Sequence, residues 1–580
     1  MKIKFIIVIS VCYLISFSLT GLNAQTAYFV DGYHGGIYGH YPAGQTGFIV
    51  DMLKKHPEWS INMEIEPETW DVVKQRDPDA YKAFKELFQD QSVTGRIEYV
   101  NPTYGQSFLY NVSGESVIRQ FSYGIDLLRK HFPEAVFTSY SSEEPCFTSC
   151  LPCILKSFGF SYASTKNPNT MWGGYTRAYG GELVNWISPD GSQILTAPRY
   201  ACEDLQSNST WQSIAWRNSK EYINKCLQAG IKNPVGMTLQ DANWNRGWAR
   251  GPWLGSDTSR FYLPTEYKTW RNYINNYSTG SSTDDWHFTQ EDMQVSLTWG
   301  AQVLQRLAQE IRVAENKVIV AEKMAALSNM YRGNTWFSES IDEAWENLLR
   351  AQHHDAWIVP YNRNLLERTH TWAEWVTVWT NLTNTNSNNI IEQSMRMLTN
   401  AGETAIVVYN TLAFQRDEQV DVKIPTIWKR RALSIVTSDD KQIPSQMTEK
   451  DGNLYLTFIA QAVPPLGFSV YRIEEDVTIA TEMPSVKQQH DGTYLLENDL
   501  YAIVIDPAKG GIIKSLKSKR LTGKEFVDPT GERSFNEMRG YFYKEEAFLS
   551  SAQSPAKIEI LEQWPISVKV AIHGKIGKHP

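Results

Sequence analysis

Four stretches hold side chains able to do acid–base or metal chemistry, and three of them follow predicted strands. Residues 31–40 follow an apolar run at 27–30 and contain Asp31 and His34 among several glycines. Glycine permits tight turns and lets a ligand approach the backbone. A carboxylate and an imidazole at the end of a strand suit metal binding or proton transfer. The alternative is a glycine-rich turn with a structural histidine.

Further carboxylates follow two later predicted strands. Glu143 and Glu144 are adjacent after the fourth strand, where they would be a nucleophile with its partner or part of a solvated loop. Asp241 follows the apolar run at 235–239, and Trp244 lies close behind it. A carboxylate beside an aromatic ring is typical of a sugar site, since the ring can stack on an apolar sugar face. The alternative for Asp241 is an Asx-turn.

The fourth stretch, His353, His354 and Asp355, ends a predicted helix. One imidazole there could complete a metal site, and the alternative is a helix end with solvated polar groups. The cysteines at 146, 150 and 153 also have metal-like spacing. Because no fourth ligand is evident nearby, we interpret them as the start of a packed helix.

The elements that would position these stretches begin with alternating strands and helices. Short apolar runs alternate with helical stretches over residues 25–288, which predicts a parallel sheet with crossover helices. At this length we expect a β/α barrel, whose chemistry collects at the carboxyl ends of the strands. We expect strands at 27–30, 60–66, 95–100 and 135–139, and helices at 47–56, 80–88, 116–131 and 151–158.

Two other patterns follow in the chain. Residues 289–400 have helical periodicity, with long runs at 295–327 and 341–352, and predict a helical bundle. Residues 401–580 predict an antiparallel β-sandwich, because short alternating strands are separated by Pro and Gly turns. A strong strand at 566–572 lies almost at the end, so we expect this sandwich to be incomplete.

The first 24 residues predict an N-terminal targeting signal. They combine a basic start, an apolar run from Phe5 to Leu19 and small residues before Gln25, as a removable export signal does. We therefore expect a periplasmic or secreted protein. No later apolar run reaches the roughly 18 residues of a membrane span, so no membrane anchor is expected. Five cysteines remain after residue 24, an odd number that does not suggest a disulfide scaffold.

Composition excludes some partners. The 580 residues carry 56 Lys+Arg against 64 Asp+Glu, a net charge of −8, which gives no electrostatic case for nucleic acid or an anionic membrane. The 20 Trp residues are a notable excess and serve either core packing or stacking on a ligand.

With these stretches in order, the chain resembles glycoside hydrolase family 38, the retaining α-mannosidases. The most specific piece is Ala351-Gln-His-His-Asp-Ala356, and the supporting pieces lie at 114–119, 151–159, 407–410, 463–467 and 497–501. The resemblance implies a seven-stranded β/α barrel, a three-helix bundle and β-sandwich domains. It also implies a divalent metal, usually zinc, and an oligosaccharide or glycan substrate.

The resemblance assigns metal ligands position by position. His34 falls on the second His of the family's first-strand motif, and His354 falls on the last ligand. Glu143 falls on the Asp that is both nucleophile and ligand. Gly36 falls where a further Asp ligand is expected, so one ligand is missing or replaced, and Asp31 is the nearest substitute in the sequence.

The implied mechanism is a double displacement. Glu143 attacks the anomeric carbon, and Asp241 protonates the leaving oxygen and then activates water. Substrate contacts are expected from Asp31, Glu144, Asp355 and Trp244. Two alternatives from other classes stay open. One is a metal-dependent polysaccharide deacetylase, and the other is a non-catalytic or degenerate glycan-binding protein.

Overall fold

The computed structural model describes residues 25–38, 41–143, 146–166, 181–208, 212–241, 251–253, 261–282, 284–288, 305–363, 369–399, 405–475, 485–563 and 566–579. The chain splits into two compact units, of which the first is Met1–Ala326 with Thr335–Gln393 and the second is Leu327–Asn334 with Ser394–Pro580. The predicted export signal at 1–24 lies outside the described residues. No helix in the described part of the chain has the length and apolar character needed to cross a membrane.

The first unit contains two five-stranded sheets in which most neighbours run parallel. One has the order β3-β2-β1-β8, with β9 also paired to β1, and all its pairs are parallel. Its strands are β1 (Ala27–Gly35), β2 (Ile61–Ile65), β3 (Ile97–Tyr99), β8 (Val235–Asp241) and β9 (Thr265–Tyr267). Every residue of β1 and of β2 is buried, as expected for parallel strands covered on both faces.

The other sheet has the order β10-β6-β7-β5-β4, and its β6–β7 pair is antiparallel. Its strands are β4 (Ser139–Tyr140), β5 (Tyr162–Ser164), β6 (Val184–Ile187), β7 (Gln193–Ala197) and β10 (Asp284–His287). A backbone hydrogen bond from Ser141 N to Val100 O joins the ends of β3 and β4, so the two sheets are neighbours. The strand expected at 135–139 forms only from residue 139 onward.

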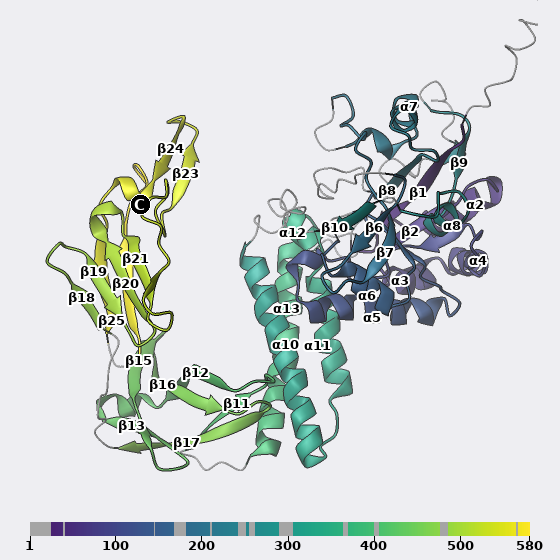
Figure 1. Ribbon diagram of the computed structural model, residues 1–580. Helices are drawn as coiled ribbons and strands as arrows, with labels where there is room; N and C mark the ends of the chain where they lie inside the picture. The colour runs from purple at the N-terminus through teal and green to yellow at the C-terminus, as the bar shows by residue number, and fades with distance from the viewer. Residues whose placement is uncertain are drawn as a thin grey trace, which may run out of the picture. The chain divides into compact units, whose positions relative to one another are not determined.

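Crossover helices lie outside these sheets (Figure 1). They are α2 (Gln45–Lys55), α3 (Thr69–Arg76), α4 (Pro78–Phe88), α5 (Gly114–His131), α6 (Leu151–Ser157), α7 (Lys220–Gln228) and α8 (Trp270–Asn276). In α5 the Ser113 side chain caps the first turn, and buried residues such as Val117, Phe121 and Leu128 recur on one face. The predicted alternation of parallel strands and helices is therefore confirmed.

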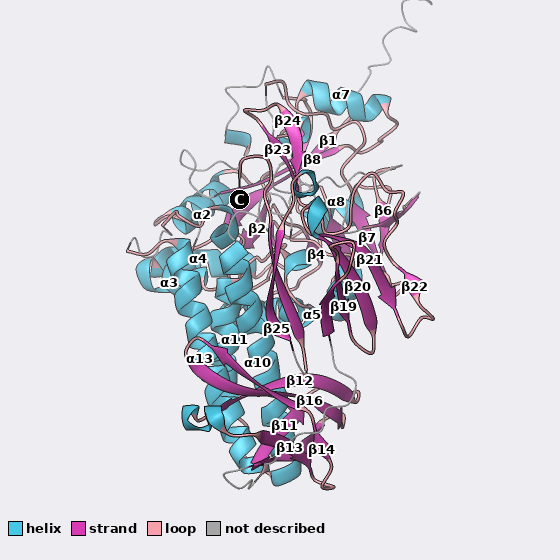
Figure 2. Ribbon diagram, turned by 90° about the vertical axis from the view of Figure 1, so that its left-hand side faces the viewer, coloured by secondary structure: helices cyan, strands magenta, loops and turns pink. Residues whose placement is uncertain are grey.

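Three long helices follow, and both ribbon views show them side by side (Figures 1 and 2). They are α10 (Gln305–Arg332), α11 (Ser338–Ala351) and α13 (Trp372–Leu398), with the short α12 (Asp355–Ile358) between the last two. In α11, Ile341, Ala344, Trp345 and Leu348 are buried at helical spacing. They share one hydrophobic cluster with residues of α10 and α13.

The second unit is mainly β-structure. A four-stranded sheet, β11-β17-β13-β14, and a three-stranded sheet, β12-β16-β15, are antiparallel and share a hydrophobic core around Ile435 and Phe458. Their strands are β11 (Ala405–Asn410), β12 (Arg416–Ile424), β13 (Leu433–Thr437), β14 (Gln442–Ile443), β15 (Ser445–Lys450), β16 (Asn453–Val463) and β17 (Gly467–Glu475). These two sheets form the predicted sandwich.

Further antiparallel strands complete this unit (Figure 2). They are β18 (Ser485–Gln488), β19 (Tyr494–Glu497), β20 (Tyr501–Asp506), β21 (Ile512–Ser518), β22 (Lys524–Glu525), β23 (Arg539–Phe542), β24 (Ala547–Ser550), β25 (Lys557–Gln563) and β26 (Val568–His573).

Candidate functional site

Three polar side chains lie in a row where the first sheet ends. His34 of β1 pairs in register with Glu64 of β2 and with Asp241 of β8. Residues paired across parallel strands share a face of the sheet, so these three lie together at the carboxyl ends of the strands. The chain leaves β1 through Gly35, whose φ of 97° is in the left-handed region that glycine tolerates.

His34 is the centre of this group. It is buried, its Nδ1 lies 3.2 Å from Glu64 Oε2, and its Nε2 lies 3.9 Å from Glu143 Oε2. Burial alone would lower its pKa, but the negative charges of Glu64, Glu143 and Asp241 outweigh it and hold the pKa well above the usual value. The surroundings of His34 therefore favour a positive charge, which a proton or a metal cation can supply.

Glu64 fixes this arrangement from within β2. Its carboxylate is fully buried and accepts hydrogen bonds from the backbone N–H of Glu143 at 2.7 Å, from Asn101 Nδ2 at 2.8 Å and from Ser142 Oγ. One side chain therefore holds both the His34 ring and the backbone that carries Glu143. A carboxylate on the far nitrogen of a metal-binding histidine is a common arrangement, because it sets the tautomer and the ring orientation.

Glu64 is a residue that the sequence analysis missed. The segment at 60–66 was expected only as a strand. The alternation of apolar and polar residues in this strand could have indicated Glu64, because both faces of a strand in a covered parallel sheet are buried. The polar face, with Asn62, Glu64 and Glu66, must then point into the protein and find partners there.

His354 reaches the same group from the helical part of the unit. Its Nδ1 lies 2.7 Å from the carbonyl oxygen of Gln106, and a carbonyl can only accept, so Nδ1 carries the proton. In the neutral ring Nε2 then has the lone pair. The His354 ring centroid lies 5.1 Å from that of His34, and Asp355 Oδ1 lies 3.8 Å from His354 Nε2.

His353 has a different part, although ligand atoms of His353, His354 and Asp355 lie within 4.8 Å of one another. Its Nε2 donates to Glu66 Oε1 at 2.5 Å, and its Nδ1 accepts from the backbone N–H of Asp355 at 3.1 Å. Both ring nitrogens are thus used. The His353 ring stacks on that of His354, with the centroids 4.4 Å apart, so we interpret His353 as a positioning residue.

Among the described residues, the ligand atoms close enough to share a metal ion are those of His353, His354 and Asp355, and the donor types at His34, His354 and Glu143 are also ones that zinc binds. Nε2 of His34, Nε2 of His354 and the Glu143 carboxylate are two imidazoles and one carboxylate, a ligand set typical of catalytic zinc sites, which keep a fourth position for water or substrate. The surplus of negative charge around His34 supports the same interpretation. The structure therefore brings His34, Glu143 and His354 together, with Asp241 and Asp355 beside them.

One expected substrate contact, Asp31, lies away from this group. Asp31 is three residues before His34 and so faces the other side of β1, where its Oδ2 accepts from the indole N–H of Trp59 at 2.8 Å. It does not stand in for the ligand missing at Gly36. Glu144 and Trp244 lie outside the described residues.

Glu66 occupies the space of the ligand expected at position 36. A Cβ built on Gly36 would lie 2.4 Å from Glu66 Oε2 and 2.6 Å from Thr69 Oγ1. Glu66 is itself held by His353 and by the backbone N–H of Tyr38 at 3.0 Å. A side chain at position 36 must therefore displace a buried, hydrogen-bonded carboxylate.

The Gly36→Asp variant consequently will not restore a ligand. We expect it to lose about 1–3 kcal/mol of unfolding free energy through overpacking, with no gain in zinc affinity. Urea unfolding and zinc titration measure the two effects. Gly114→Ala is the matched control, because its added Cβ meets nothing within 4 Å. Tighter zinc binding by Gly36→Asp at unchanged stability would contradict this account of Glu66.

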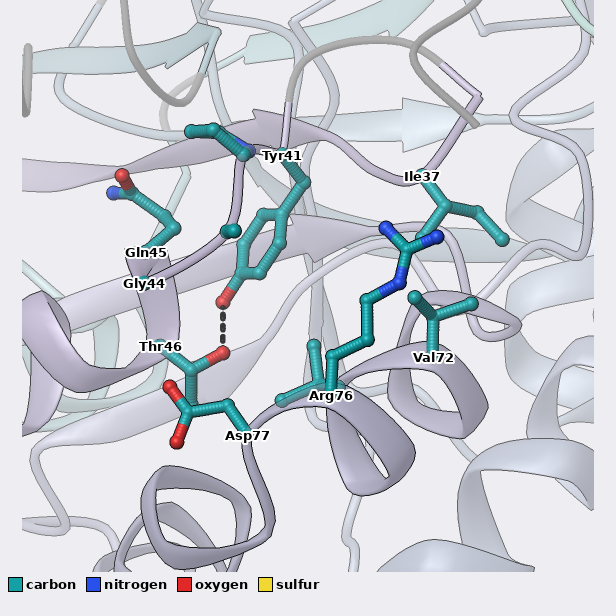
Figure 3. A pocket seen from close by; sticks show the side chains of 11 residues that line it. Ile37, Tyr41, Gly44, Gln45, Thr46, Val72, Arg76 and Asp77 are labelled. Atoms are coloured by element: carbon teal, nitrogen blue, oxygen red, sulfur yellow. Dashed lines mark hydrogen bonds between the residues drawn. The ribbon is translucent and has the colours of Figure 1, made fainter. Parts of the chain in front are cut away.

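A cavity of about 310 Å³ is lined by residues of the loop after β1, the start of α2, and α3. Figure 3 shows the side chains that line it, among them Arg76, Asp77 and Tyr41, which is hydrogen-bonded to Thr46 Oγ1 at 2.8 Å. None of the predicted site residues lines it. We therefore place the candidate site at His34 and not in this cavity.

Comparison with known proteins connects this geometry to a family. Residues 47–284 match the model of the glycosyl hydrolases family 38 N-terminal domain. Lysosomal alpha-mannosidase of Dictyostelium discoideum is 24% identical over 135 residues, which are 20% of this chain and 13% of that enzyme.

Two solved structures from Enterococcus faecalis are similar in fold. One is an alpha-mannosidase with a TM-score of 0.63 and 16% identity, covering 94% of this chain and 67% of that chain. The other is a protein in the glycosyl hydrolase family 38, with a TM-score of 0.63 and 16% identity, covering 95% of this chain and 66% of that chain. This chain thus spans about two thirds of their length and matches a much smaller part of the Dictyostelium enzyme.

Proposed function

We propose that this chain is a divergent member of glycosyl hydrolase family 38, and that it is a glycosidase that cleaves α-linked sugars with retention of configuration. The observation that carries the proposal is the meeting of Glu143, Asp241 and His354 at His34. The substrate class that we propose is an oligosaccharide or glycan with α-mannose-like residues. The predicted export signal supports action outside the cytoplasm.

Membership of this family also leads to a proposal about the architecture of the first unit. We propose that the parallel strands β8, β1, β2, β3, β4, β5 and β7 close into the family's seven-stranded barrel, supported by the bond between Ser141 and Val100 that links β3 to β4. The helices α10, α11 and α13 would be its three-helix bundle. This arrangement places the end of α11 at the carboxyl end of β1, where His354 meets His34.

The chemistry begins with Glu143. Its carboxylate attacks the anomeric carbon and forms a glycosyl ester, while the bond to the leaving oxygen breaks and Asp241 gives that oxygen its proton. Asp241 then takes a proton from water, the water oxygen attacks the anomeric carbon, and Glu143 leaves as a carboxylate. A retaining enzyme needs its two carboxyl groups about 5–5.5 Å apart. Glu143 Oε2 lies 3.9 Å from His34 Nε2, and Asp241 pairs in register with His34.

His34, His354 and Glu143 would hold a divalent metal. Bound there, a zinc ion would supply a Lewis acid that draws sugar hydroxyls into a fixed orientation. Glu64 keeps the His34 ring turned toward Glu143, and the Gln106 carbonyl keeps Nε2 of His354 unprotonated. Asp355, beside His354, would accept hydrogen bonds from the sugar.

A panel of aryl α- and β-glycosides, run with the full chain and with its metal content measured, tests this function. We expect turnover of an α-glycoside that a chelator abolishes and added zinc restores. The His354→Ala variant should lose the metal, whereas His56→Ala, whose side chain is 26% exposed and pairs with Glu58, should keep it.

Gly36 supports one competing function, a glycan-binding protein with a degenerate metal site, because an expected ligand is absent there. That protein would bind sugars without hydrolysing any aryl glycoside and without responding to a chelator. Such a result would overturn the glycosidase proposal.

A further inference from the structure

Two cysteines far apart in the sequence meet beside the second sheet. Cys202 lies in the turn that follows β7, and Cys226 lies on α7. The residues are 24 apart in the chain, and their Sγ atoms are 3.8 Å apart. Cys226 is fully buried, whereas Cys202 is partly accessible. Cys202 is therefore the member of the pair that an oxidant can approach, and the Cys226 sulfur lies in contact with it.

The segment that carries Cys202 is already held against its surroundings on both sides. Lys225, next to Cys226, donates from Nζ to Asp204 Oδ2 at 2.6 Å. Glu203, fully buried, pairs with the buried Lys166 and accepts from the backbone N–H of Tyr200 at 3.0 Å. A bond between two sulfurs requires compatible backbone positions, and these contacts hold the turn against α7 without it.

We propose that Cys202 and Cys226 are a disulfide-forming pair, which closes by exchange with a small-molecule disulfide such as oxidised glutathione. The Cys202 thiolate attacks one sulfur of that disulfide and releases a glutathione thiolate, which takes up a proton. The Cys226 sulfur then attacks the mixed disulfide at Cys202, its proton passing to the departing glutathione thiolate, which leaves as the second glutathione thiol. The protein dithiol is oxidised, and one glutathione disulfide is reduced to two thiols.

The local charges favour this order of attack. The contact with Cys226 and then the positive charge of Lys166 lower the pKa of Cys202, against its partial burial and the negative charge of Glu203. The predicted export signal would bring the chain to an oxidising compartment, where such a bond persists. The bond would tie the turn after β7 to α7, and it would lower the conformational entropy of the unfolded chain.

The three other described cysteines are internal controls for non-specific oxidation. Cys146 is buried, Cys150 is exposed and Cys153 is intermediate, and one disulfide leaves these three as thiols. The odd cysteine count does not suggest a disulfide scaffold, and a single disulfide in a large protein is compatible with that.

Peptide mass spectrometry tests the linkage directly. The full chain is equilibrated with a glutathione buffer, denatured without reductant, alkylated and digested. We expect a peptide joining Cys202 to Cys226 in the wild type and in the Cys150→Ser variant. Alkylation of both sulfurs, or a glutathione that stays on Cys202, would overturn the proposal.

Thermal unfolding gives a second readout that does not depend on enzymatic activity. The oxidised wild type should melt several degrees above the reduced wild type. Cys202→Ser, at the partly exposed member of the pair, should remove this difference, and Cys150→Ser should keep it. Equal melting of oxidised and reduced wild type, or a difference that survives in Cys202→Ser, would contradict the bond.

Discussion

The Glu143→Gln variant is expected to lower kcat/KM on an aryl α-mannoside by about 10³-fold or more, because an amide cannot form the glycosyl ester. It also weakens a ligand of the proposed metal. The fold should survive, since Glu64 contacts the backbone N–H of Glu143 and that bond is unchanged by the substitution. Steady-state kinetics on the metal-loaded full chain, with a melting curve for each variant, measure both effects.

Glu58→Gln is the matched control, a change of the same type at a side chain that is 54% exposed, and it should leave turnover unchanged. Full turnover by Glu143→Gln would remove this residue as nucleophile. The adjacent Glu144 would then be the carboxylate to test, by the same substitution and the same assay.

The second large effect concerns the buried pair of Glu66 and His353. Both side chains are almost completely inaccessible, and removing one partner leaves a buried polar group without its bond. We therefore expect Glu66→Ala to lower the free energy of unfolding by about 3–5 kcal/mol, which urea unfolding measures. Zinc affinity should fall as well, because His353 stacks on His354 and holds that residue's position.

Glu115→Ala controls for the loss of a carboxylate that bonds a nearby side chain. Glu115 pairs with Arg119 one turn along α5 and is 41% exposed, so its removal should cost no more than about 0.5 kcal/mol. A Glu66→Ala protein as stable as Glu115→Ala would show that the Glu66–His353 pair does not hold the two parts of the site together.

Local patterns predicted much of the fold. The periodic run at 341–352 became α11, and the segment at 116–131 became α5, each beginning a little earlier than expected. In both helices the apolar residues of one face became the buried ones, which is the relation that periodicity measures. The strand at 135–139 was shorter than expected, because only its last residue enters the ladder with β5.

The site was predictable only in part, because the sequence does not show which face of a strand points toward the other site residues. His34 and His354 stood out because adjacent or glycine-flanked histidines are unusual at element ends. Glu64 and Glu66 did not, because alternating polar residues also describe a strand with one solvated face. Asp31 was selected by its nearness in sequence to His34, but the two-residue period of a strand turns it to the opposite face.

The most direct test of the central claim is proton NMR of the first sugar released by the metal-loaded full chain from an aryl α-mannoside. Retention through a glycosyl ester on Glu143 predicts that the α-anomer appears first and then mutarotates. A β-anomer formed first, or no released sugar from the metal-loaded protein, would contradict the account.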